Sequence, residues 1–145
     1  MSYHTLNSVL AKAQYARPEE TGGVLVGYYT SDLKTAVITE TIEEREDSRS
    51  GKNWFIRGTA GLMQALREKW RREQSTYYVG EWHSHPGSEP APSKKDMEAM
   101  LDIVNSPKEQ CPEPILLIVG NDLQDFNDAN FWVYPKGRGV RRLKY

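Results

Sequence analysis

Residues 82–96 read Trp-His-Ser-His-Pro-Gly-Ser-Glu-Pro-Ala-Pro-Ser-Lys-Lys-Asp, and this stretch decides how the chain folds around its chemistry. It continues an aromatic and apolar run, so that a strand is predicted over residues 77–85. Side chains two residues apart in a strand point to the same face of the sheet. His83 and His85 therefore present two imidazoles side by side, and the Pro- and Gly-containing loop 86–92 lets the chain turn over the end of the strand.

A third metal-binding group follows on the next predicted helix. Ser93 begins this helix and Asp96 lies on its first turn. Two imidazoles and one carboxylate, with water in the fourth position, form a common catalytic zinc shell. We therefore interpret His83, His85 and Asp96 as candidate ligands of one catalytic Zn²⁺, which would lower the pKa of bound water toward about 7. Simpler explanations stay open, because such histidines can be surface residues and Asp96 can serve the helix start that Ser93 caps.

A metal-dependent hydrolase also needs a base that takes the proton of the attacking water. Residues 18–23 read Pro-Glu-Glu-Thr-Gly-Gly and offer Glu20, at the point where the first predicted helix gives way to the first predicted strand. Acidic residues that follow a proline usually lie on a solvated turn. Glu20 therefore gains its significance only beside the candidate metal ligands.

Three helices are predicted from apolar residues that recur three and four positions apart. The first precedes Pro18, the second covers residues 59–74, and the third begins at Ser93. Their apolar faces are expected to consist of Leu6, Val9, Leu10 and Ala13; of Leu62, Leu66 and Trp70; and of Met97, Met100, Leu101 and Val104.

Strands alternate with these helices along the chain. They are predicted over residues 21–29, 34–42, 53–57, 77–85, 115–119 and 131–134, the first two as an antiparallel hairpin. We predict an α/β fold, a single domain over residues 1–145 with a core from about 5 to 135, in which a mixed β-sheet is flanked by helices. Residues 43–52 and 121–130 are expected to be exposed polar loops, and residues 136–145 a basic C-terminal tail.

The composition argues against several classes of function. A net charge of −1 gives no electrostatic case for nucleic acid or an anionic membrane as a partner. No apolar stretch approaches the roughly 20 residues that span a bilayer, and no secretory signal is expected at the start of the chain. The single cysteine, Cys111, forms neither an internal disulfide nor a cysteine-based zinc cluster. We expect a cytoplasmic protein.

Three segments together resemble the signature of a known family. They are Glu-Thr-Gly-Gly-Val-Leu-Val-Gly at 20–27, His-Ser-His-Pro at 83–86 and Ser-Lys-Lys-Asp at 93–96. The pattern is similar to that of the JAMM zinc metalloproteases, the catalytic MPN or Mov34 domain that is also called JAB. The compact length resembles the stand-alone prokaryotic branch, and the family resemblance implies a cytidine-deaminase-like sandwich.

The resemblance implies roles for five residues. His83, His85 and Asp96 would ligate zinc, Glu20 would be the general acid/base, and Ser93 would donate to the oxyanion of the tetrahedral intermediate. The implied reaction is hydrolysis of an amide bond at the C-terminal end of a ubiquitin-like protein, in deconjugation or precursor processing. Operon partners similar to E1 and E2 proteins, including those of antiphage systems, are implied as well.

Two alternatives remain open for the function. The same chemistry would serve a peptidase that acts on a sulfur-carrier protein with a Gly-rich C-terminal tail. A non-catalytic MPN scaffold would use the fold as an interaction platform, although such domains usually lack motif residues and none is missing here. A substrate tail could be held by strand addition to an exposed edge, for which residues 43–52 are the candidate.

Overall fold

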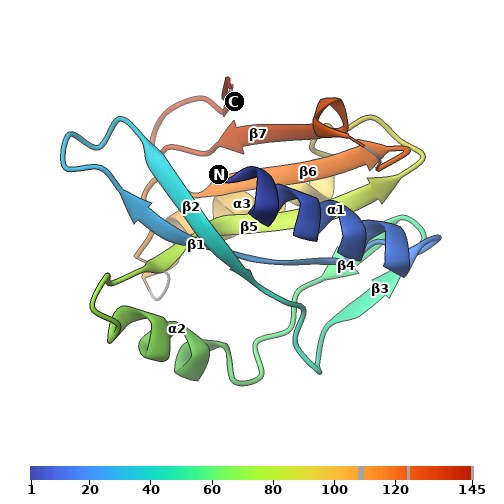
Figure 1. Ribbon diagram of the computed structural model, residues 1–145. Helices are drawn as coiled ribbons and strands as arrows, with labels where there is room; N and C mark the ends of the chain where they lie inside the picture. The colour runs from blue at the N-terminus through green and yellow to red at the C-terminus, as the bar shows by residue number, and fades with distance from the viewer. Residues whose placement is uncertain (108–109, 124, 145) are drawn as a thin grey trace.

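The structure is a computed structural model that describes residues 1–107, 110–123 and 125–144. Residue 124 of the predicted loop 121–130 and Tyr145 of the predicted tail lie outside the described residues. A six-stranded sheet of order β2-β1-β5-β6-β7-β8 forms the centre of the molecule (Figure 1). Its strands are β1 (Gly22–Tyr29), β2 (Ala36–Ile42), β5 (Tyr77–Pro86), β6 (Ile115–Asn121), β7 (Ala129–Val133) and β8 (Arg141–Arg142).

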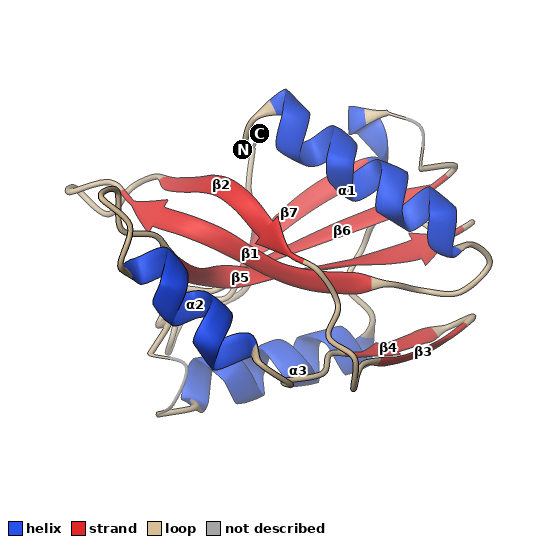
Figure 2. Cartoon of the chain, turned by 60° about the horizontal axis from the view of Figure 1, so that its bottom comes forward, coloured by secondary structure: helices blue, strands red, loops and turns tan. Residues whose placement is uncertain are grey.

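Helices cover both faces of this sheet (Figure 2). Helix α1 (Tyr3–Ala16) lies on one face, and α2 (Leu62–Trp70) and α3 (Lys94–Asn105) lie on the other. Alternating side chains of β6 divide the core accordingly: Leu117 packs in the cluster that contains α1 residues, while its neighbours Leu116 and Ile118 pack in the cluster that contains α2 and α3 residues. The predicted α/β fold with flanking helices is confirmed.

The sheet is mixed, as predicted. β1 pairs antiparallel with β2, which confirms the expected hairpin, and also antiparallel with β5. β5 and β6 pair in parallel. The strand that carries the two histidines therefore lies in the middle of the sheet, with hydrogen-bonded neighbours on both sides.

A one-residue bulge in β5 sets the face on which the histidines lie. Against β1, the register passes from Gly80 directly to Tyr78, which leaves Val79 unpaired in this ladder. Val79 and Trp82 are three positions apart, yet both pack in the core cluster on the α1 side. The bulge thus shifts the alternation by one residue, and without it both histidines would face α1.

Gly80 occupies a position that suits no other residue. Its φ is +155°, and a Cβ atom placed there would lie 1.9 Å from the carbonyl oxygen of Ile115 on β6. An L side chain at this point would force β5 and β6 apart, which would disturb the strand that carries the histidines.

We expect Gly80→Ala to lower the free energy of unfolding by about 1–3 kcal/mol, because the added methyl group overpacks the contact with Ile115. Urea denaturation of the variant would measure the change. Gly139→Ala is the matched control, since a Cβ atom at Gly139 meets nothing within 4 Å. Equal stability of the two variants would contradict the role given to Gly80.

Residues 43–52, predicted to be an exposed loop, contain a strand instead. β3 (Arg49–Gly51) pairs antiparallel with β4 (Trp54–Ile56) in a separate two-stranded sheet. The prediction failed because Arg-Ser-Gly has no apolar alternation, and its strand conformation depends on hydrogen bonds to the aromatic β4. The predicted strand 53–57 therefore exists, but outside the main sheet.

The inner face of α3 also differs from the prediction. Met100, Ile103 and Val104 are buried, whereas Met97 and Leu101 are 40% and 50% exposed. Asp96 lies four residues before Met100, so turning Asp96 toward the histidines turns Met97 and Leu101 outward. The predicted inward orientation of these two residues was wrong.

Three further segments depart from the predictions in part. Helix α2 is shorter than residues 59–74, and Trp70 at its end is 58% exposed. Leu123 is fully buried and a short 3₁₀ helix covers Phe126–Asp128, so residues 121–130 are not simply an exposed loop. In the tail, β8 pairs with β7. None of the described helices has the length and apolar character needed to cross a membrane.

Candidate active site

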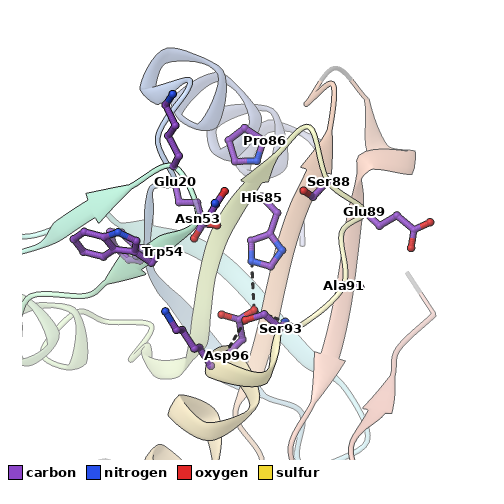
Figure 3. A pocket seen from close by; sticks show the side chains of 13 residues that line it. Glu20, Asn53, Trp54, His85, Pro86, Ser88, Glu89, Ala91, Ser93 and Asp96 are labelled. Carbon is purple, nitrogen blue, oxygen red and sulfur yellow. Dashed lines mark hydrogen bonds and ion pairs between the residues drawn. The ribbon is translucent and has the colours of Figure 1, made fainter.

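The structure brings the three predicted metal ligands together on the α3 side of the sheet. His83 Nε2 lies 3.2 Å from Asp96 Oδ1, and His85 Nε2 lies 3.3 Å from Asp96 Oδ2. The two imidazoles are stacked with their centroids 5.1 Å apart. One potential ligand atom from each of the three residues lies within 4.8 Å of the others, so the group could hold a metal ion. Figure 3 shows two of them, His85 and Asp96, facing each other.

Ser93 and Asp96 form a capping box at the start of α3. Ser93 N donates to Asp96 Oδ2 at 2.5 Å, and Asp96 N donates to Ser93 Oγ at 3.3 Å. The capping explanation of Asp96 is therefore correct, and the carboxylate faces the two imidazoles at the same time. The cap uses an acceptor lone pair of Ser93 Oγ, which leaves the hydroxyl proton free to be donated elsewhere.

The loop over residues 86–92 is held against the end of β6. Asn121 N donates to Ser88 O at 2.6 Å. A Cβ atom at Gly120 would lie 2.4 Å from Ser88 O, so the close approach of the two segments requires glycine at this position. The loop thereby returns the chain to the start of α3 within reach of the histidines.

Glu20 is placed by backbone contacts with two other strands. Thr21 N donates to Ser84 Oγ at 3.0 Å, and Ser84 N donates to Thr21 O at 2.8 Å. Glu20 N itself donates to Gly51 O on β3 at 2.9 Å. Glu20 is buried and lines the same cleft as His85, Ser93 and Asp96. The five residues singled out in the sequence are thus gathered at one place.

The electrostatics of the site follow from burial and from the imidazole–carboxylate contacts. Burial raises the pKa of Glu20, and the opposing effect of His85 and His83 only partly offsets it. Burial of Asp96 would also raise its pKa, but the contacts with His83 and His85 outweigh this and hold it well below its ordinary value. Asp96 therefore stays anionic, while Glu20 is shifted toward the range of a base that works near neutral pH.

The cleft beside these residues has a volume of about 440 Å³. Residues that sequence reasoning did not assign to it form much of its lining, among them Lys52, Asn53, Trp54 and Lys95. Figure 3 shows Asn53 and Trp54 on the Glu20 side of the cleft. Ser84 was likewise given no role; its place between the two histidines indicates only that its side chain faces away from theirs, and the structure adds that it meets Thr21.

Comparison with known proteins places this site in context. Residues 3–134 match the family described as prokaryotic homologs of the JAB domain. A protein of Enterobacter hormaechei named "CD-NTase/cGAS isopeptidase" is 37% identical over 144 residues, which cover 99% of this chain and 79% of that protein. A Sinorhizobium fredii protein named "Probable metalloprotease y4qB" is 28% identical over 102 residues, which cover 69% of this chain and 62% of that protein.

Two solved structures resemble the fold. One is the solution structure of a protein from Desulfitobacterium hafniense, with a TM-score of 0.62, 20% identity, and coverage of 99% of this chain and 88% of that chain. The other is the crystal structure of a JAB1/MPN domain protein from Archaeoglobus fulgidus, with a TM-score of 0.53, 19% identity, and coverage of 96% and 89%. At these identities the likeness concerns the architecture.

We expect zinc to bind more weakly as the pH falls. Burial alone would lower the pKa of His85, but the contact with Asp96 outweighs it and raises the pKa above its ordinary value. A histidine must lose its proton to ligate a metal, so affinity should rise with pH and level off only above this raised pKa. Isothermal titration calorimetry with zinc between pH 6 and 8.5 measures the effect, and an affinity that does not vary with pH would contradict it.

Proposed function

Because this chain belongs to the prokaryotic homologs of the JAB domain, we propose that it is a zinc-dependent isopeptidase whose metal is held by His83, His85 and Asp96. Family membership and the relatives named isopeptidase and metalloprotease make it a metallopeptidase. The observation that carries the proposal is the clustering of two imidazole nitrogens with the carboxylate of Asp96, at a cleft that His85, Asp96 and the buried Glu20 line together.

The donor set fits a zinc ion. Two His nitrogens and one carboxylate oxygen are ligands of catalytic zinc sites that keep a further position open. Among the described residues, the buried His83 Nε2 has no hydrogen-bond partner of ordinary geometry, although it lies 3.2 Å from Asp96 Oδ1. A metal ion would satisfy such a nitrogen. The same set also suits Fe(II), but a buried Glu20 beside it favours the hydrolytic chemistry of zinc.

In the proposed reaction, zinc, Glu20 and Ser93 each have a separate role. Zinc, when bound, supplies Lewis acidity that polarises a carbonyl and brings the pKa of water to about 7. Glu20 takes the proton of the attacking water and returns it to the leaving amine, a role that its raised pKa supports. The Ser93 hydroxyl, whose proton the helix cap does not use, donates a hydrogen bond to the oxyanion as the carbonyl carbon becomes tetrahedral.

The proposed substrate is the C-terminal tail of a ubiquitin-like protein joined through an amide bond. β4 offers an edge for this tail, because among the described residues it pairs only with β3 and its residues line the cleft. Strand addition at residues 54–56 therefore replaces our earlier expectation for residues 43–52. The relative named CD-NTase/cGAS isopeptidase supports a conjugated protein as the substrate.

The wider setting is part of the same proposal. We place the enzyme in the cytoplasm, as a single domain over residues 1–145, beside E1- and E2-like operon partners in antiphage defence. The gathered site argues against a non-catalytic scaffold, because a platform for protein binding needs neither the imidazole–carboxylate cluster nor a buried Glu20.

Glu20→Gln should lower kcat by about 10²- to 10⁴-fold, because the amide keeps the shape of the side chain but cannot accept the proton. The measurement is cleavage of a ubiquitin-like fusion through its Gly-Gly tail, together with zinc content by mass spectrometry. Zinc content should be unchanged, since Glu20 is not among the proposed ligands.

Two further variants are measured beside Glu20→Gln, one as a control and one as a test of the metal ligands. Glu19→Gln is the matched control, because the neighbouring Glu19 is exposed and its carboxylate accepts from Ser50 Oγ rather than lining the cleft. His83→Ala should lose both zinc and activity. Undiminished cleavage by Glu20→Gln would overturn the assigned base, and full zinc retention by His83→Ala would overturn the ligand set.

Ser93→Gly separates the catalytic role of Ser93 from its capping role. Glycine at an N-cap costs only a few tenths of a kcal/mol, whereas alanine costs about 1 kcal/mol. Loss of an oxyanion donor should lower kcat by about 10²- to 10³-fold in both variants. Steady-state kinetics and thermal denaturation of Ser93→Gly and Ser93→Ala test this. Full activity of Ser93→Gly would leave Ser93 with the capping role alone.

A further inference from the structure

Two clefts meet at Asp96. The first is the cleft of about 440 Å³ that Glu20 lines, and the second has a volume of about 310 Å³ and lies between residues of β4 and α3. Three residues line both clefts: Phe55, Lys95 and Asp96. A substrate chain that runs from one cleft to the other past the metal ligands must therefore pass Lys95.

Lys95 is an exposed cation at this junction and forms no ion pair with any described residue. Lys52, which lines only the first cleft, likewise forms no ion pair with a described residue, but two other neighbouring cations differ. Lys94 lies 3.8 Å from Glu98, and both of these residues are exposed. Arg57, which lines the second cleft, lies 2.5 Å from Glu81, and both side chains are largely buried. The charge of Lys95 is thus available to a ligand, whereas that of Arg57 is neutralised.

None of the described acidic residues around the two clefts forms an ion pair with Lys95, although its charge acts on Glu20 from beyond ion-pair distance. Glu20 and Asp96 belong to the site already described. Figure 3 shows Glu89 across His85 from Glu20, with its carboxylate directed away from Asp96. Asp102 lies two turns farther along α3, a rise of roughly 10 Å. A substrate carboxylate that enters the junction could therefore form an ion pair with the Lys95 ammonium group.

We propose that Lys95 makes the enzyme selective for substrates with an acidic side chain within two residues of the scissile bond. The inference rests on the proposed function, because it concerns the chain that passes the same site. The ammonium group of Lys95 pairs with the substrate carboxylate as the chain lies between the two clefts. The selectivity is electrostatic and therefore weakens as salt is added.

The test uses the full zinc-bound chain and peptides that span the junction of the Gly-Gly fusion. The Gly-Gly tail is kept, and Asp, Asn or Lys is placed at each of the two positions that follow the scissile bond. Wild type should prefer Asp over Asn by about 2- to 5-fold in kcat/KM, mostly through KM, since an exposed ion pair has this strength. Lys95→Glu should reverse the order in favour of Lys. Glutamate is well tolerated in the first turn of a helix, so this variant should fold.

Lys94→Glu is the matched control, because it makes the same change of net charge one residue away on a side chain that lines neither cleft. It should keep the preference for Asp. Equal reversal by both variants would show a long-range effect of charge and overturn the assignment. Because the charge of Lys95 also acts on Glu20, Lys95→Glu should change kcat for all peptides alike. A change of this kind that leaves the order of Asp, Asn and Lys peptides as in wild type would show that Lys95 acts only through Glu20, and would also overturn the assignment.

Binding distinguishes failure of this inference from failure of the proposed function. The same peptides, labelled for fluorescence anisotropy, are titrated into zinc-bound Glu20→Gln protein, where no turnover is needed. Tighter binding of Asp peptides that depends on Lys95 supports the inference, whether or not wild type cleaves them. If wild type cleaves none of the peptides, that result contradicts the proposed function alone. Equal binding of Asp and Asn peptides overturns the inference alone.

Discussion

The bulge at Gly80 is the constraint on which the site depends. β5 runs in unbroken parallel register with β6 from Gly80 to Pro86, so the irregularity is confined to the ladder with β1. The bulge shifts by one residue the alternation of side chains between the two faces of the sheet. As a result, Trp82 points into the core on the α1 side and both imidazoles point toward α3. A strand without the bulge would bury the imidazoles among the apolar side chains of α1, far from any residue of α3.

One carboxylate in the first turn of α3 both caps the helix and contacts the two imidazoles. Asp96 closes the helix cap by accepting from Ser93 N, and this hydrogen bond also fixes the orientation in which the carboxylate meets the two imidazoles. Outer hydrogen bonds of this kind orient metal ligands and keep them in place. Capping and the proposed ligation, which the sequence presents as competing explanations, are therefore compatible in one arrangement. It also fixes the rotation of the helix, which is why Met97 and Leu101 face outward.

Sequence patterns predicted those features of the site that depend on residues close together in the chain. The shared face of His83 and His85 follows from strand periodicity, and the helix start at Ser93 follows from capping preferences. The clamp between Thr21 and Ser84 joins residues far apart in the chain, and neither residue has a pattern that reveals its partner. The same holds for β3, whose polar residues become a strand only beside β4. Contacts between distant segments were thus beyond prediction, although they are what holds Glu20 at the histidines.

The residues of the cleft fall into two groups by how firmly the fold holds them. Glu20 is fixed through its main-chain nitrogen, which donates to Gly51 O, and Asp96 through its carboxylate, which accepts from Ser93 N. Lys95 and Trp54, which line the same cleft, are exposed side chains on segments that the fold holds through their backbone. We therefore expect substitutions of the exposed side chains to alter what the cleft accepts while leaving the architecture intact. Membership of the family therefore says much about the reaction and little about the substrate, whose identity has to be argued from side chains such as Lys95.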